Sequence, residues 1–108
     1  MRILIYEDNL MWSSRLVKSV NGLGHEAVLK TQATEETEQA DAAIVNLGSS
    51  TLKPEHLVPQ LNRAGIKVIG HAGHKEKELH EIGRDLGCHL LVTNSELTHK
   101  LPQILQKV

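Results

Sequence analysis

The strongest constraint on the fold is a five-fold alternation of short apolar runs with longer polar or amphipathic segments. The apolar runs are typical of buried β-strands and lie at Arg2–Tyr6, Glu26–Leu29, Ala42–Leu47, Lys67–Gly70 and His89–Thr93. Strands that alternate with helices predict right-handed crossovers and a parallel sheet covered on both faces. With 108 residues and no linker or repeat, we expect one α/β domain over residues 1–108.

The segment after the first strand carries the clearest helix signal. Behind Asn9, apolar residues recur at three- and four-residue steps from Trp12 to Leu23, which is the spacing of one helix face. Gly22 and Gly24 supply a C-terminal stop. We expect a helix that starts beside the end of the first strand, with Trp12 packed on its inner face.

The next two connections have weaker helix signals. In the acidic run Thr34–Glu38, Thr37 occupies the position where a capping box requires Glu or Gln, so we expect a helix of only one or two turns. In the third connection Pro54 can open a helix, but Pro59 falls inside it. That helix therefore either kinks or begins at Pro59.

A fourth helix is predicted over Lys75–Leu86, with Gly87 as its terminator. Its inward-facing residues should be Leu79, Ile82 and Leu86. Ser95 is expected to cap a fifth segment, which Pro102 divides into a turn and a short terminal helix. The inward-facing residues there should be Leu97, Leu101, Ile104 and Leu105.

Composition argues against several classes of protein. Lys and Arg number 12 against 13 Asp and Glu, for a formal charge of -1, so we expect no nucleic-acid partner. No Phe, one Tyr and one Trp are too few for a base-stacking surface. No apolar stretch is long enough for a signal-peptide core or a membrane span. A single cysteine, Cys88, fits a buried site in a soluble cytoplasmic protein.

Acidic side chains follow the first strand, whereas an amide ends the third. Glu7 and Asp8 come directly after Tyr6, and Asn46 ends a similar apolar run. The carboxyl ends of parallel strands meet at one rim of the sheet, where open α/β sheets bind ligands. We therefore expect an acidic rim made of Glu7 and Asp8, with Asn46 beside it.

Several short motifs resemble the receiver domain of response regulators, and the resemblance spans nearly the whole chain. The matching segments are Glu7-Asp8-Asn9, Asp41-Ala-Ala-Ile-Val-Asn46, Ile69-Gly-His-Ala72 and Gly87–Ser95. The resemblance implies a flavodoxin-like (βα)5 three-layer sandwich with a parallel five-stranded sheet of order 2-1-3-4-5. Because the chain ends with the fifth helical segment, we expect a receiver-like domain with no output domain.

Four positions depart from the receiver pattern together. Asn46 replaces the phosphoacceptor aspartate, His71 the hydroxyl residue of the fourth strand, Leu91 the switch aromatic and Asn94 the lysine. A carboxamide is a far poorer nucleophile towards phosphorus than a carboxylate, and Asn94 offers no cation to pair with a phosphoryl group. We interpret the chain as a pseudo-receiver that does not take part in phosphoryl transfer.

The acidic rim also has a metal-binding interpretation. Glu7 and Asp8, together with the side-chain oxygen of Asn46 and the carbonyl of Gly48, offer hard oxygen ligands for weak Mg²⁺ binding. The same carboxylates could instead only cap the following helix, near its positive dipole end. The sequence leaves both interpretations open.

The function that we predict is a stand-alone, non-phosphorylatable signalling module that acts by binding a protein partner. No catalytic constellation is complete, so we expect neither enzyme activity nor a cofactor, apart from the weak Mg²⁺ site. The alternative is a small metal-binding protein or metal-dependent enzyme that uses Glu7, Asp8, His71 and His74. A third hypothesis is phosphorylation at another acidic residue, and a homodimer is left open.

Overall fold

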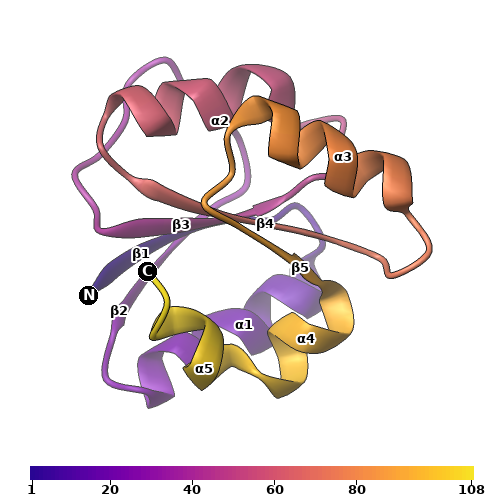
Figure 1. Ribbon diagram of the computed structural model, residues 1–108. Helices are drawn as coiled ribbons and strands as arrows, with labels where there is room; N and C mark the ends of the chain where they lie inside the picture. The colour runs from indigo at the N-terminus through magenta and orange to yellow at the C-terminus, as the bar shows by residue number, and fades with distance from the viewer.

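A parallel sheet of five strands forms the centre of the computed structural model, which describes residues 1–108 (Figure 1). The strands are β1 (Arg2–Tyr6), β2 (Glu26–Lys30), β3 (Ala42–Asn46), β4 (Lys67–Ala72) and β5 (Leu90–Thr93). They lie in the order β2-β1-β3-β4-β5, and every pairing is parallel. The predicted fold class and strand order are confirmed.

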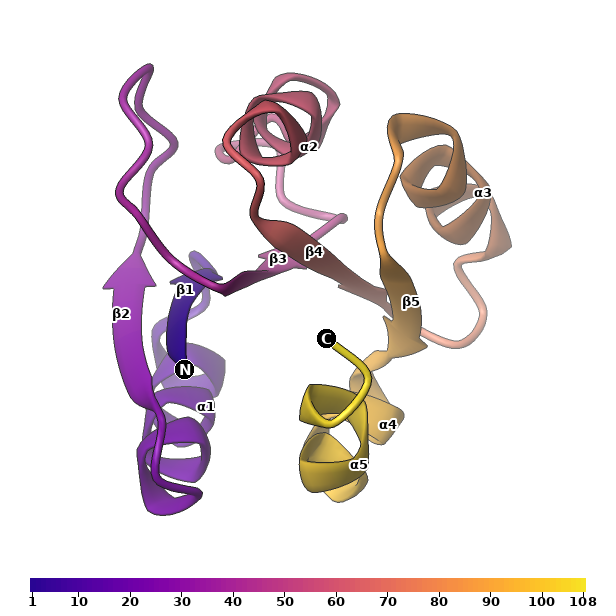
Figure 2. The ribbon, with the colours of Figure 1, turned by 60° about the vertical axis from the view of Figure 1, so that its left-hand side comes forward.

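Helices cover both faces of this sheet. They are α1 (Leu10–Gly22), α2 (Pro54–Arg63), α3 (Lys77–Leu86), α4 (Asn94–His99) and α5 (Leu101–Leu105). In Figures 1 and 2, α1, α4 and α5 lie on one face, while α2 and α3 lie on the other, which gives the expected three layers. None of these helices combines the length and the hydropathy that crossing a membrane would require.

Each face of the sheet has its own apolar core. One core, beneath α1, α4 and α5, consists of Ile3, Ile5, Leu16, Val20, Ala42, Ile44, Ile69, Val92, Leu97, Leu101, Ile104 and Leu105. The other, on the opposite face, consists of Leu4, Tyr6, Ala43, Val45, Leu52, Leu57, Val58, Leu61, Ile66 and Val68. Successive side chains of a strand point to opposite faces, so a strand buried on both sides is a continuous apolar run.

The short helix expected at Thr34–Glu38 is absent, and residues 31–41 form an irregular connection. The Glu38 carboxylate is paired with Arg2 at 3.0 Å and with Lys30. The side-chain amide of Gln60 donates to the carbonyl oxygen of Thr34 at 2.8 Å. Side chains from elsewhere in the fold thus hold the connection, and it has no apolar stripe that a helix would bury.

The third connection, between β3 and β4, resolves an alternative that the sequence left open. α2 begins at Pro54 and continues through Pro59, so a start at Pro59 is wrong. A proline at the first helical position has no N–H to leave unpaired. Lys53, which precedes the helix, adopts a left-handed conformation with φ of 47°.

The inner face of α3 differs from the prediction. Ile82 is 48% exposed, Leu79 and Leu86 are half-buried, and the buried residue of the helix is Gly83. A Cβ atom at Gly83 would lie only 2.6 Å from Cδ2 of Leu91. The helix therefore approaches β5 through a glycine, a contact that the spacing of large apolar residues does not reveal.

Thr93, rather than Ser95, caps the fifth helical segment. The Thr93 hydroxyl accepts a hydrogen bond from the N–H of Glu96, and the Glu96 carboxylate accepts one from the N–H of Thr93. The segment splits at Lys100 into α4 and α5, as Pro102 indicated. The four predicted inward-facing residues, Leu97, Leu101, Ile104 and Leu105, are all buried.

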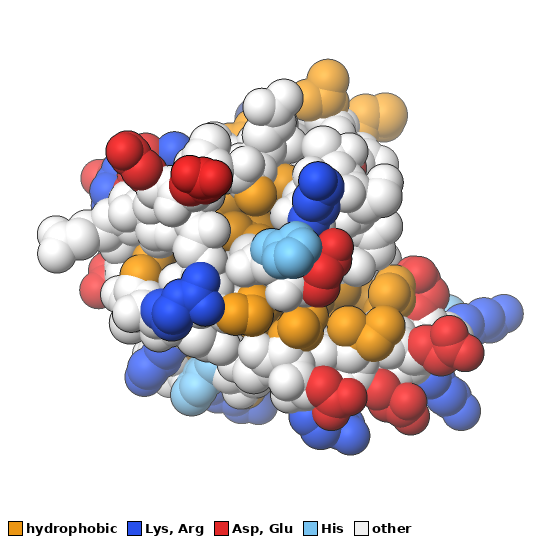
Figure 3. Space-filling model, turned by 90° about the horizontal axis from the view of Figure 1, so that it is seen from above, with side chains coloured by type: hydrophobic (Ala, Val, Ile, Leu, Met, Phe, Trp, Pro, Cys, Tyr) orange, Lys and Arg blue, Asp and Glu red, His pale blue; other side chains and the backbone are white.

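The outer surface of α2 and α3 has no region of a single charge sign. Figure 3 shows Lys and Arg side chains interspersed with Asp and Glu, and hydrophobic side chains between them. This distribution matches the nearly balanced formal charge of -1.

The turn after α3 generates a stability prediction. Gly87 has φ of 96°, and a Cβ atom there would lie 2.8 Å from Nδ2 of Asn62, which donates to the Gly87 carbonyl. We expect Gly87→Ala to lower the free energy of unfolding by about 1–2 kcal/mol. Urea denaturation measures this change. The control is Gly22→Ala in α1, where a Cβ meets nothing within 4 Å, and a loss of stability equal to that of Gly87→Ala would contradict the explanation.

Candidate functional site

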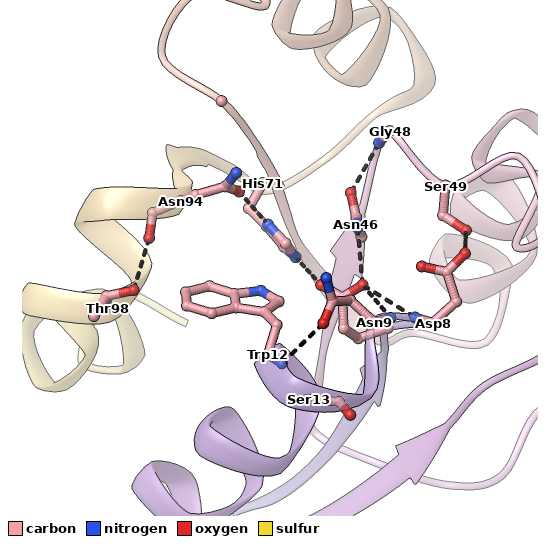
Figure 4. Close-up of polar contacts among 12 residues, drawn as sticks. Asp8, Asn9, Trp12, Ser13, Asn46, Gly48, Ser49, His71, Asn94 and Thr98 are labelled. Atoms are coloured by element: carbon pink, nitrogen blue, oxygen red, sulfur yellow. Dashed lines mark hydrogen bonds and ion pairs between the residues drawn. The ribbon is translucent and has the colours of Figure 1, made fainter.

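Four of the predicted residues converge at the carboxyl ends of the central strands. Glu7 follows β1, Asn46 ends β3, His71 lies beside it on β4, and Asn94 begins α4. Together with Asn9 and Trp12, these residues line a pocket of about 280 Å³ (Figure 4). Parallel pairing brings the strand ends together, and α1 supplies the remaining wall.

The Glu7 carboxylate is fully buried and tightly held. Its Oε2 accepts hydrogen bonds from the N–H of Asp8 at 3.0 Å, from the N–H of Asn9 at 3.3 Å and from Nδ2 of Asn46 at 2.8 Å. Three donors on one oxygen replace the hydrogen bonds to water that the carboxylate loses on burial. One oxygen of Glu7 therefore joins β1, the start of α1 and β3.

The Asn46 side chain is engaged at both ends. Its Nδ2 donates to Glu7, and its Oδ1 accepts a hydrogen bond from the N–H of Gly48 at 3.0 Å. The amide thus presents a donor, not an oxygen, to the carboxylate. Of the oxygen atoms predicted to bind Mg²⁺, the Asn46 Oδ1 is turned towards the backbone of the following loop.

Asp8 occupies a different environment from Glu7. It is exposed, and its Oδ2 accepts a hydrogen bond from the Ser49 hydroxyl at 2.6 Å. Figure 4 shows Asp8 and Ser49 on the side away from His71 and Asn94. The two carboxylates of the predicted acidic rim therefore do not form one surface.

His71 is the second buried polar residue of the pocket, with 1% exposure. Its Nδ1 lies 2.7 Å from Oδ1 of Asn94, and its Nε2 lies 3.6 Å from Oε1 of Glu7. The Trp12 indole packs beside the imidazole with ring centroids 6.3 Å apart. Burial lowers the pKa of His71, while the Asn94 hydrogen bond and the Glu7 charge raise it in part, so the imidazole is neutral at neutral pH.

The other predicted positions lie outside this pocket. The Leu91 side chain packs against Gly83 on the α3 side of the sheet. His74 is exposed, two residues beyond β4. No three side chains of the His, Cys, Asp and Glu types are grouped so that they could hold a metal ion.

Two features of the site carry a signal that the sequence analysis did not use. Asn9 caps α1, since its Oδ1 accepts a hydrogen bond from the N–H of Trp12 at 3.1 Å, and an Asn directly before the first helical residue is a common capping pattern. Thr93 and Glu96 form the Thr-x-x-Glu pattern of a capping box and place Asn94 at the first turn of α4. The Ser49 contact with Asp8 has no comparable local pattern.

Comparison with known proteins identifies the architecture. The structure is similar to a response regulator receiver domain from Methanospirillum hungatei, with a TM-score of 0.77 and 19% identity over 98% of this chain and 94% of that chain. The chain has the fold of a receiver domain. A putative response regulator from Chloroflexus aurantiacus has a TM-score of 0.79 and 15% identity, over 97% of both chains.

The receiver domain of NtrX from Brucella abortus is similar to the same degree, with a TM-score of 0.80 and 13% identity over 97% of this chain and 95% of that chain. No protein-family model and no curated protein matches the sequence. At these identities the likeness establishes the receiver fold, and function has to be argued from the pocket.

The Glu7 contacts generate a prediction with a matched pair of variants. In Glu7→Gln the amide oxygen can keep the three N–H donors, while the NH₂ group can donate to His71, so we expect the free energy of unfolding to stay within about 1 kcal/mol of the wild type. Glu7→Ala leaves those donors without a partner and should lose about 2–3 kcal/mol. Urea denaturation compares the two variants. Equal losses would show that the contacts to Oε2 do not support the fold.

Burial of neutral His71 makes stability depend on pH. Its pKa is lowered in the folded state, so the unfolded chain binds a proton first as the pH falls below the ordinary value of about 6.5. Wild-type stability should therefore drop relative to His71→Gln, by up to about 1.4 kcal/mol per pH unit. Urea denaturation of the wild type and of His71→Gln, at pH values from about 7.5 to about 5, measures the difference in the free energy of unfolding. A constant difference would mean that the pKa of His71 is not lowered.

Proposed function

We propose that the chain is a receiver-like signalling module that acts without phosphorylation, by binding a partner protein. The observation that carries this proposal is the position of Asn46 at the end of β3, with its amide bonded to Glu7 and to the N–H of Gly48. A neutral amide held in this way has neither the charge nor the free oxygen that attack on phosphorus requires.

The surroundings of Asn46 support the same conclusion. No Lys or Arg lines the pocket, so a phosphoryl group would meet the Glu7 carboxylate without a cation to offset the repulsion. Asn94 makes a neutral hydrogen bond to His71. The pocket is thus organised around one buried negative charge.

Two exposed apolar side chains provide a surface for a partner. Leu10 is 71% exposed and Met11 83% exposed, and both lie in the first turn of α1, next to Trp12 of the pocket wall. Large exposed apolar side chains on the helix that carries Trp12 favour contact with another protein. We therefore assign the rim of the pocket and the start of α1 as the binding surface.

An enzyme or a metalloprotein has less support. The pocket contains no hydroxyl or thiol nucleophile, and burial raises the pKa of the Cys88 thiol, which lies outside it, to about 11. Asp8 faces Ser49 rather than the pocket, and His74 is exposed. The four residues of the metal hypothesis thus do not share one cavity.

Incubation with acetyl phosphate and Mg²⁺ tests the absence of phosphorylation. We expect the intact mass of the wild type to stay unchanged, because Asn46 cannot form an acyl phosphate. A known receiver domain treated in the same way is the positive control. A hydroxylamine-labile adduct on Asp8, Glu7 or any other residue would overturn the proposal.

Asn46→Asp tests the environment of this position. The new carboxylate would face Oε2 of Glu7 across the 2.8 Å now bridged by the Asn46 amide, so the free energy of unfolding should fall by about 1–3 kcal/mol. Mg²⁺ should restore part of this loss by binding between the carboxylates. Thermal melts with and without Mg²⁺ measure both effects. An unchanged melting temperature in both conditions would contradict the contact between Asn46 and Glu7.

A further inference from the structure

Two buried atoms in the pocket have no hydrogen-bond partner, Oε1 of Glu7 and Nε2 of His71. They face each other at 3.6 Å, which is too long for a direct hydrogen bond. Their side chains are 0% and 1% exposed, so neither atom is satisfied by bulk solvent. Buried polar atoms without partners are rare and indicate a missing group.

The hydrogen bond on the far side of the imidazole defines what that group must offer. Oδ1 of Asn94 can only accept, so Nδ1 of His71 carries the proton and Nε2 keeps its lone pair. Oε1 of Glu7 is likewise an acceptor. The two atoms therefore need a group that donates at least two hydrogen bonds, and the buried negative charge of Glu7 favours a positive one.

We propose that this pocket receives the ammonium group of a lysine side chain presented by the partner protein. An ammonium group has three N–H donors and one positive charge, enough to bond both atoms and to neutralise Glu7 once the side chains that cover these atoms move aside. Glu7 is the only charged side chain that lines the pocket, so no cation of this chain occupies that role. The inference rests on the proposed function and adds the chemistry of the partner.

The walls of the pocket suit the rest of a lysine side chain. The Trp12 indole provides an apolar and π-rich surface along which the methylene groups can lie. At about 280 Å³, the pocket has room for a single extended side chain rather than for a folded loop. Leu10 and Met11 are exposed in the same first turn of α1 as Trp12, and we expect them to contact residues that flank that lysine.

A divalent metal ion fits the same two atoms less well. Its ligands would be one carboxylate oxygen of Glu7 and one imidazole nitrogen of His71. No third side chain of the His, Cys, Asp or Glu types joins them. Structural and catalytic transition-metal sites use three or four protein ligands. An ammonium group needs only the two acceptors that are present.

Trp12 is the only tryptophan of the chain, so its fluorescence reports binding without a label. The probe is an acetylated and amidated Leu-Lys-Leu tripeptide, and its control is the same peptide with the lysine amine acetylated. We expect a saturable change in Trp12 emission with the first peptide and none with the second. Equal binding of both peptides, or of neither, would overturn the proposal.

Matched variants locate the contact. Glu7→Gln should weaken binding of the tripeptide at least about tenfold, because it removes the charge and one acceptor. Asp8→Asn removes the same charge from the adjacent residue, which faces Ser49, and should change the affinity less than about threefold. Equal effects of the two variants would show that only the overall charge matters and would overturn the proposal.

A smaller probe distinguishes a partner lysine from a free amine. n-Butylamine carries the same ammonium group without flanking residues, so it should bind at least about tenfold more weakly than the tripeptide. A double variant in which serine replaces both Leu10 and Met11 should bind the tripeptide more weakly and bind n-butylamine with unchanged affinity. If n-butylamine binds as tightly as the tripeptide, the pocket binds a small amine, and the proposal of a partner lysine is overturned.

A second measurement does not depend on any variant. The Nε2 resonance of His71 in long-range ¹H–¹⁵N spectra should show an unprotonated nitrogen that shifts when the tripeptide binds. An Nε2 that carries the proton in the free protein would overturn the proposal. None of these titrations contains a phosphoryl donor, so failure of the lysine proposal and failure of the phosphorylation-independent function give different results.

Discussion

The contacts of one buried oxygen, Oε2 of Glu7, organise the carboxyl end of the sheet. It accepts three hydrogen bonds, from the first two backbone N–H groups after Glu7 and from the side chain of Asn46. A buried carboxylate is stable only where such donors surround it. The direction in which α1 leaves β1 and the side-chain conformation of Asn46 both depend on this arrangement, and the second oxygen of Glu7 is thereby aimed at His71.

The same arrangement supports the proposal that this chain acts without phosphorylation. A phosphoryl-transfer site gathers several negative oxygens and offsets them with cations. Here a neutral amide, a neutral imidazole and a second amide surround a single carboxylate. The set forms a hydrogen-bonded chain from Asn46 to Glu7 and from His71 to Asn94, interrupted only between Oε1 and Nε2. Under the proposal of a partner lysine, that gap is where the ammonium group binds.

The similar structures show how little of this follows from the fold. Receiver domains with 13–19% identity superimpose over nearly the whole chain, because the sheet order and the two covering layers depend on apolar patterning. Function resides in a few polar side chains at the strand ends, and these can change while the cores remain. The fold therefore establishes the position of the site, and the residues in it have to supply the argument about what it does.

The sequence by itself determined the five strands and the residues at their ends, because burial on both faces demands continuous apolar runs. The order of the strands came from the resemblance of short motifs to the receiver domain. It did not separate buried Glu7 from exposed Asp8, two adjacent carboxylates whose environments depend on Asn46 and Ser49, some forty residues away along the chain. It also missed the glycine contact of Gly83, where close approach of α3 needs the absence of a side chain. Local spacing predicts elements, whereas only packing between distant segments decides which polar atom is buried and which partner it meets.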